Sequence, residues 1–183
     1  FFRLLAFSGA RKSELLALQW KDIDFANKSV MIGKTLALDE NNQILIQTPK
    51  TATSKRTISL DDETLKTLSK WRTMQRTDYL ALGFNTSSDE QYIFTNERNE
   101  LYYPQVVNDW LKYLIKKYDL PQITPHHFRH THASLLLQAG VPVKEVSERL
   151  GHKDIKITLE IYSHVMPEEA EKTANKFANF VGI

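Results

Sequence analysis

The chain has 183 residues, of which 42% are hydrophobic and 25% are charged, with a formal net charge of +2. This length suits one domain with a sizeable core, and the small positive charge is only a weak hint of a polyanionic partner. The longest apolar runs fall short of the roughly 18 residues of a membrane span, and no signal peptide is recognisable. The chain contains no cysteine, which excludes disulfides and thiolate metal sites and fits a reducing cytosol. We therefore expect a cytoplasmic protein without a membrane partner.

The opening segment, F-F-R-L-L-A-F, predicts a helix that is already under way, because no N-cap residue precedes it. We therefore expect the chain to be a fragment whose preceding part is absent. Ser8 is expected to cap a second helix, whose apolar face would be formed by Leu15, Leu16 and Leu18.

Strand-like segments follow as S-V-M-I near Ser29, Q-I-L-I-Q-T from Gln43 and K-R-T-I-S-L from Lys55. Residues 39–42 and 48–51 have the composition of hairpin turns between them. This pattern predicts a small antiparallel sheet of about three strands.

The remainder of the sequence is predominantly helical. Asp61 and Asp62 open a long helix that is expected to reach about Leu82. Further helices are expected at about 104–118, 126–138, 143–150, 155–163 and 167–180. The predicted fold class is α+β, mainly helical, with the small sheet in the N-terminal part.

Arg11 lies at the expected start of the second helix, and Glu14 follows one turn later. A helix N-terminus with a guanidinium group suits an anion, and Glu14 would orient Arg11 through an i,i+3 pair. The alternative is that both are ordinary surface charges. Lys50 lies in a predicted turn, where a lysine is either solvent-exposed or a flexible cation that reaches into a site.

The stretch T-P-H-H-F-R-H-T-H-A-S-L-L-L carries a dense histidine cluster. Thr124 and Pro125 suit a helix start, and the three-residue spacing places His126 and Arg129 on one helix face. Leu135, Leu136 and Leu137 are expected to carry apolar bulk into the core. One use of this cluster is phosphate recognition, with arginine as a clamp and histidine as a proton carrier. The other is a zinc site formed by His126, His130 and His152.

Near the end of the chain, Gly151 is expected to end one helix as a C-cap, and His152 follows in the connecting loop. Tyr162 would end the next helix, and a lone tyrosine there usually serves packing. The two helices around L-G-H also look like a helix-turn-helix, which leaves a non-catalytic DNA-binding module open as an interpretation.

Taken together, these segments resemble the motifs of one family. S-G-A-R-K-S-E-L-L-A-L-Q-W-K-D-I-D resembles the first arginine box of the tyrosine recombinases, and T-P-K-T with K-R-T-I-S-L resembles their β-hairpin lysine segment. H-H-F-R-H-T-H-A-S resembles their H-x-x-R box, and L-G-H-K-D-I-K-I-T-L-E-I-Y-S-H their closing box. The 23-residue separation of Arg129 from His152 and the 10-residue separation of His152 from Tyr162 are typical of the family. The resemblance runs from about Leu4 to Val165, and its closing segment is similar to integrases of phages and conjugative transposons from low-GC Gram-positive bacteria.

The resemblance implies that residues 1–183 are the catalytic domain of a tyrosine recombinase or integrase, with the N-terminal DNA-binding domains absent. The implied reaction is site-specific DNA recombination, as in integration or excision of a mobile element. It needs no metal, no cofactor and no ATP, and it passes through a 3′-phosphotyrosine. The implied catalytic residues are Arg11, Lys50, His126, Arg129, His152 and Tyr162.

The implied partners are double-stranded attachment-site DNA, further copies of the chain in a homo-tetramer, and an accessory directionality factor. The tail after Pro167 predicts a helix with one apolar stripe, which includes Phe177 and Val181. This stripe would either pack on its own core or dock on a neighbouring protomer of the tetramer.

Two departures from the family pattern are local: His127 stands where many relatives have aspartate, and Phe128 where many have leucine. Three other interpretations remain open, namely a topoisomerase with the same catalytic fold, the helix-turn-helix module and a histidine-rich metal hydrolase. The module would need neither Tyr162 nor Lys50, and the metal enzyme would lack acidic or sulfur ligands. The DNA target does not follow from these motifs, because base-edge contacts specify it.

Overall fold

The computed structural model describes residues 1–48, 55–165, 180 and 181, with backbone only for 164 and 165. In chain order the elements are α1 (Phe2–Ser8), α2 (Lys12–Leu16), a 3-10 turn (Trp20–Asp22), β1 (Ile23–Asp24), β2 (Ser29–Ile32), β3 (Thr35–Leu38), β4 (Ile44–Gln47), β5 (Arg56–Ser59), α3 (Asp62–Ala81), α4 (Val106–Tyr118), α5 (Pro125–Gln138), α6 (Val143–Leu150) and α7 (Lys156–Val165). Within the described part of the chain, no helix combines the length and apolarity needed to cross a bilayer.

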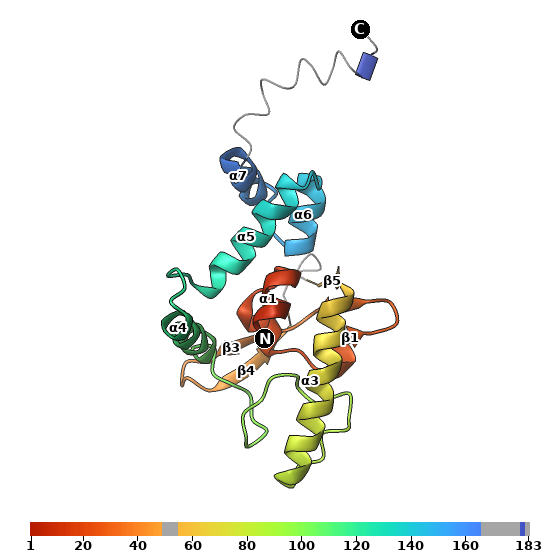
Figure 1. The fold of residues 1–183 in the computed structure, drawn as a ribbon, viewed down its shortest axis with the longest axis vertical. Coiled ribbons are helices and arrows are strands. Elements are labelled where there is room, and N and C mark those ends of the chain that lie inside the picture. Colours follow the sequence, from red (N-terminus) through yellow and green to blue (C-terminus); the bar gives the residue numbers. More distant parts are fainter. Residues whose placement is uncertain (49–54, 166–179, 182–183) are drawn as a thin grey trace.

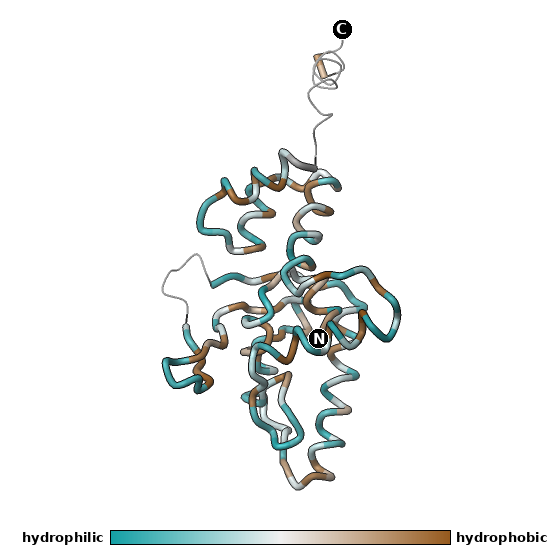
Figure 2. The backbone as a smooth tube through the Cα atoms, turned by 90° about the vertical axis from the view of Figure 1, so that its left-hand side faces the viewer, coloured by the Kyte–Doolittle hydropathy of each residue, from teal (hydrophilic) through white to brown (hydrophobic). Residues whose placement is uncertain are grey.

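The elements form two lobes (Figure 1). We call residues 1–118 the N-terminal lobe, which contains all the described strands, and residues 125–165 the C-terminal lobe, which consists of α5, α6 and α7. The tube in Figure 2 shows the same division from another side. The lobes meet where α5 packs on α1 and where α6 packs on β5.

Each lobe has its own hydrophobic core. In the N-terminal lobe the core extends from α1 and α2 through the sheet to α3, and Trp20 at its centre donates its indole N–H to Gln75 at 2.7 Å. In the C-terminal lobe a smaller core is formed by Ala133, Leu137, Val146 and Leu150. The contact region between the two cores carries polar groups as well as Phe128 of α5, which packs against the N-terminal core.

The strands form two small sheets instead of the single sheet that the sequence predicts. One has the order β1-β2-β5, and the other is the antiparallel pair β3-β4. The segment from Gln43 therefore pairs with Thr35–Leu38, a strand that the sequence reading missed. The sequence of this strand, T-L-A-L, contains leucine and alanine and only one β-branched residue, so it carries a weak strand signal. The predicted turn at 39–42 is confirmed, because the Asp39 side chain accepts hydrogen bonds from the backbone N–H groups of Asn41 and Gln43.

The helix starts and ends follow the local signals. The Asp61 side chain accepts a hydrogen bond from the backbone N–H of Thr64 at 3.0 Å and caps α3. Pro125 occupies the first turn of α5, as expected. Gly151 ends α6 in the left-handed region with φ of 68°, a conformation that a residue with a side chain would disfavour.

Two local predictions are wrong. Ser8 does not cap α2, because it is the last residue of α1, where its hydroxyl donates to the carbonyl of Leu4 at 2.6 Å. Leu135 does not enter the core, since it is 59% exposed while Leu137 is 1% exposed. Successive helix positions differ by about 100°, so three consecutive leucines cannot share one face. The predicted turn at 48–51 falls mostly, and the predicted helix at 167–180 almost entirely, outside the described residues.

Candidate active site

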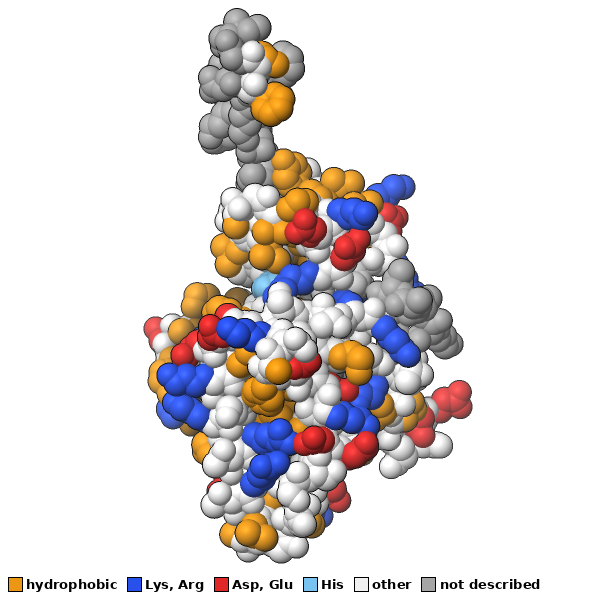
Figure 3. Space-filling view, turned by 90° about the vertical axis from the view of Figure 1, so that its right-hand side faces the viewer, with side chains coloured by type: hydrophobic (Ala, Val, Ile, Leu, Met, Phe, Trp, Pro, Cys, Tyr) orange, Lys and Arg blue, Asp and Glu red, His pale blue; other side chains and the backbone are white. Residues whose placement is uncertain are grey.

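Two cavities, of about 380 and 320 Å³, open where the lobes meet. His126 and Arg129 line both of them, while Arg11 lines the first and His152 the second. Figure 3 shows a histidine in the constriction between the two lobes. The fold thus brings together four of the six predicted site residues, from three separate segments of the sequence.

Arg129 is the most buried of these residues, at 4% exposure. Its two terminal nitrogens donate hydrogen bonds to the carbonyl of Gly9 at 2.8 Å and to the carbonyl of Leu150 at 2.7 Å. Burial, and then the nearby charge of Arg11, lower the pKa of Arg129 to about 9, so it remains charged at neutral pH. The two bonds fix the guanidinium plane and leave other N–H donors for a ligand in the cavities.

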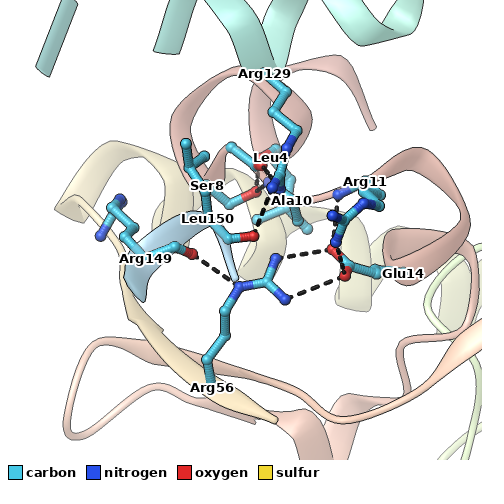
Figure 4. Close-up of polar contacts among 10 residues, drawn as sticks. Leu4, Ser8, Ala10, Arg11, Glu14, Arg56, Arg129, Arg149 and Leu150 are labelled. Carbon is cyan, nitrogen blue, oxygen red and sulfur yellow. Dashed lines mark hydrogen bonds and ion pairs between the residues drawn. The ribbon is translucent and has the colours of Figure 1, made fainter. Parts of the chain in front are cut away.

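Arg11 immediately precedes α2 and is held by Glu14, as the three-residue spacing predicts. Glu14 accepts from the Arg11 backbone N–H at 2.7 Å and from its guanidinium at 3.1 Å. Figure 4 shows that the same carboxylate also meets Arg56 of β5, at 3.1 and 2.9 Å. Burial would raise the pKa of Glu14, but the hydrogen bonds and charge of Arg56, and then of Arg11, bring it below its ordinary value. Glu14 is therefore a buried carboxylate anion and not a solvated surface charge.

The two site histidines are neutral at neutral pH. Burial, followed by the charges of Arg129 and Arg11, lowers the pKa of His152 to about 4. Burial, and then Arg129, also lowers the pKa of His126. His152 Nδ1 lies 2.8 Å from the hydroxyl of Thr158, which orients the ring. Neutral imidazoles beside fixed cations can accept a proton or donate a hydrogen bond.

Tyr162 lies on α7, whose residues Ile157, Glu160 and Ile161 form one wall of the second cavity. Its half-buried ring packs against the core of the C-terminal lobe, and Tyr162 is not among the residues that line either cavity. Lys50 lies outside the described residues. The structure therefore places Tyr162 on an element of the site without placing its ring in a cavity.

The zinc interpretation finds no support among the side chains that the structure describes. No group of three or more His, Cys, Asp or Glu residues there could hold a metal ion. The site residues His126 and His152 have arginine as their main charged neighbour, which repels a cation.

Three residues of the site were missed by the sequence reading: Arg56, which pairs with Glu14; Thr158, which contacts His152; and Lys12, which lines the first cavity. Arg56 stands 42 positions from Glu14, so no local spacing could indicate the pair. Lys12 directly follows Arg11, and this basic dipeptide was the one local signal available.

A helical fold that directs the buried guanidinium of Arg129, the half-exposed guanidinium of Arg11 and two neutral imidazoles to adjoining cavities has the donors that suit a phosphate-like anion. The match to known proteins narrows the class of protein. Residues 1–169 match the model of the phage integrase family, and the chain belongs to that family. The family resemblance and the fold class expected from the sequence are both confirmed.

The similarity to curated relatives and to solved structures agrees with this family assignment. The chain is 35% identical to the ICEBs1 integrase of Bacillus subtilis (strain 168) over 180 residues, which are 96% of this chain and 47% of that protein. It is 32% identical to the transposase from transposon Tn916 of Enterococcus faecalis, over 91% of this chain and 42% of that protein. The Tn1549 transposon integrase in complex with circular intermediate DNA superimposes with a TM-score of 0.81 at 26% identity, over 96% of this chain and 58% of that one. The chain spans about half the length of the curated relatives that it matches.

Proposed function

We propose that this chain is the catalytic domain of a site-specific recombinase that breaks and rejoins double-stranded DNA, with Tyr162 as the nucleophile. The observation that carries the proposal is the meeting of Arg11, His126, Arg129 and His152 at two adjoining cavities. The DNA-bound state of the Tn1549 integrase and the naming of relatives as integrases support DNA as the substrate.

Attack on a phosphodiester adds negative charge to its two non-bridging oxygens. Arg11 and Arg129 offer rigid guanidinium donors to these oxygens, and preorganised donors of this kind stabilise the transition state without reorganisation. When the Thr158 hydroxyl donates to Nδ1 of His152, the proton of that ring lies on Nε2, which then donates to the same phosphate. The clamp therefore has the donors that the chemistry needs without a metal ion.

The transfer conserves bonds and protons. The Tyr162 oxygen forms a bond to phosphorus, the bond from phosphorus to the 5′ oxygen breaks, and a 3′-phosphotyrosine results. His126, neutral at pH 7, accepts the phenolic proton, and Lys50 protonates the leaving 5′ oxygen. A 5′-hydroxyl from another duplex then reverses the chemistry and joins the exchanged strands, so ATP is not required.

A substitution of the proposed nucleophile, Tyr162, tests the proposal directly. Tyr162→Phe removes one oxygen and no charge, so it should bind attachment-site DNA normally and form no covalent adduct. The assay uses the full-length protein and a nicked attachment site that traps the intermediate, with and without EDTA. A covalent adduct in Tyr162→Phe contradicts the assignment, and a wild-type reaction that EDTA abolishes and zinc restores favours the metal hydrolase.

For the assembled protein we propose a homo-tetramer on DNA, in which the tail after Pro167 docks on a neighbouring protomer, and an accessory directionality factor as a further partner. The support is the apolar stripe of the tail sequence and its position just after Tyr162. Deletion of residues 168–183 should leave DNA binding intact and abolish cooperative assembly, as measured by gel shift over a range of protein concentrations. A truncated protein that loses its thermal transition and DNA binding would show that the tail belongs to the core.

A further inference from the structure

The candidate catalytic residues are divided between the two lobes. Arg11 belongs to the N-terminal lobe, whereas His126, Arg129, His152 and Tyr162 belong to the C-terminal lobe. Phe128 of α5 packs against the N-terminal core and stacks on Phe2 of α1, and polar bonds across the joint further determine the placement of the clamp.

Arg149, near the end of α6, donates the largest set of these bonds. One terminal nitrogen donates to the carbonyls of Phe7 at 3.1 Å and Ser59 at 3.0 Å, and the other donates to the Ser59 hydroxyl at 3.1 Å. Its Nε donates to His132 Nε2 at 3.0 Å. Burial lowers the pKa of Arg149, as expected where its partners are carbonyls, a hydroxyl and an imidazole. One side chain thus joins α6 to α1, β5 and α5.

His132 of α5 extends this connection. Its Nδ1 lies 2.9 Å from the carbonyl of Ala6, and its Nε2 faces the guanidinium of Arg149. Burial, and then the charge of Arg149, lower the pKa of His132 to about 4, so the ring is neutral. The neutral ring therefore donates through Nδ1 to Ala6 of α1 across the joint, and it accepts through Nε2 from Arg149 within the C-terminal lobe.

The backbone at Gly9 lies close to two side chains of the C-terminal lobe. Gly9 has φ of 66°, and a Cβ there would lie 2.6 Å from Cδ2 of His132 and 2.8 Å from Cδ2 of Leu150. A residue with a side chain at this position would therefore displace His132 or Leu150. The carbonyls of Arg149 and Leu150 accept bonds from Arg56 and Arg129, and Figure 4 shows these contacts.

The end of α6 is consequently fixed at three points just before the chain reaches His152. The Arg149 side chain donates hydrogen bonds to α1, β5 and α5. The carbonyls of Arg149 and Leu150, the last two of the helix, accept bonds from Arg56 of the N-terminal lobe and Arg129 of the C-terminal lobe. Loss of the bonds at residue 149 would leave the C-terminal lobe attached through the Arg56 and Arg129 contacts and through Phe128, with its orientation less restricted.

We infer that Arg149 and His132 are positioning residues that set the distance between Arg11 and the catalytic groups of the C-terminal lobe. Neither residue lines the two cavities of the site, so neither would touch the reacting phosphate. The inference rests on the proposed function, because it concerns the geometry of that same clamp.

The test compares Arg149→Met, His132→Phe and their double variant in the full-length protein. Both changes keep apolar bulk and remove the bonds across the joint. Lys144→Met is the matched control, because its side chain lies on the same helix and is 79% exposed. Three quantities are measured: the thermal transition, the affinity for attachment-site DNA, and the single-turnover rate of covalent adduct formation at saturating DNA.

We expect the folded single variants to bind DNA like the wild type and to form the adduct on the order of 10²-fold more slowly, since small misplacements of catalytic groups have such effects. The double variant should be slowed by less than the product of the two single effects, because the bond between Arg149 and His132 is already lost in each single variant. Should Arg149→Met fail to fold, His132→Phe carries the test, since it retains a ring and loses only two hydrogen bonds.

Adduct formation at the wild-type rate in the folded variants would overturn the inference while leaving the proposed function intact. The rate is measured at a temperature well below the thermal transition. A variant with lower stability but an unchanged rate of adduct formation would show a purely structural role and would also overturn the inference. If the wild-type protein itself forms no adduct, the proposed function is wrong, and the inference that rests on it is wrong as well.

Discussion

Arg56 forms a buried ion pair with Glu14 in which both terminal nitrogens meet both carboxylate oxygens, at 3.1 and 2.9 Å. The side chains are 7% and 9% exposed, and the same carboxylate holds Arg11. Arg56 follows Lys50 by six positions in the sequence. The pair therefore ties the strand that continues from the lysine segment to the arginine at the cavity.

Removal of this carboxylate should destabilise the fold. Glu14→Ala leaves the buried Arg56 without its partner, and breaking a buried pair in this way typically costs about 3–5 kcal/mol. The free energy of unfolding in urea measures the effect. Glu40→Ala, at an exposed position of the β3–β4 turn, is the control, and its change should stay within about 0.5 kcal/mol. Equal losses in both variants would mean that the Glu14 pair contributes nothing beyond an ordinary surface charge.

The role of the clamp residues and the role of the general acid can be distinguished with a substrate whose leaving group needs no proton. Arg11→Ala and Arg129→Ala should each slow the chemical step about 10²–10³-fold, because each removes a donor to the developing charge. Lys50→Ala should also be slow, but a 5′-bridging phosphorothiolate should restore it selectively, since a sulfur leaving group needs no proton. The rates are measured as single-turnover adduct formation. If the sulfur substrate restores Arg129→Ala equally well, Lys50 is not the acid.

Acid should destabilise the protein through His132 and His152. Each has a pKa lowered to about 4, below the 6.5 of a free histidine, so between these values the unfolded chain binds more protons. Their stabilising contribution is present above pH 6.5 and is lost as the pH falls from 6.5 towards 4. Thermal unfolding across this range should show a falling transition temperature, and His132→Phe should weaken the dependence. An unchanged slope in that variant would show that His132 titrates normally.

The sequence was most informative where a signal is local. Asp61, Pro125 and Gly151 mark helix boundaries through their own backbone and capping chemistry, and the structure places those boundaries accordingly. The three-residue spacing likewise put His126 and Arg129 at the same cavities. These features depend on residues within one or two turns of each other.

Features that depend on distant contacts were not predictable in the same way. The bond from Arg149 to Phe7 spans 142 positions, and that from Arg56 to the Arg149 carbonyl spans 93. No periodicity encodes such pairs, because they exist only after the two lobes have come together. The division of the site between lobes was therefore visible only in the structure. The strand β3 was missed because T-L-A-L has one β-branched residue, whereas the equally short β2, β4 and β5 each have two.

Lys12 provides the last prediction, because it adds a cation beside the clamp. Its Nζ donates to the Asn108 side chain of α4 at 3.2 Å, and both residues line the 380 Å³ cavity together with Arg11. We expect this half-buried ammonium group to contact a backbone phosphate next to the one that is cut. Removing the charge of one lysine that contacts a phosphate reduces the magnitude of the slope of log affinity against log salt by about 1, and it weakens binding to all sequences similarly.

Lys12→Met should therefore show a reduced salt slope and weaker DNA binding at low salt, with a nearly normal rate of adduct formation once the DNA is saturating. Fluorescence anisotropy at several salt concentrations gives the slope, for specific and nonspecific DNA alike. Lys70→Met, on the exposed surface of α3 and outside both cavities, serves as the control and should keep the wild-type slope. A Lys12→Met slope equal to that of the control would remove this phosphate contact from the DNA interface, and a slow reaction at saturating DNA would instead assign Lys12 to the clamp itself.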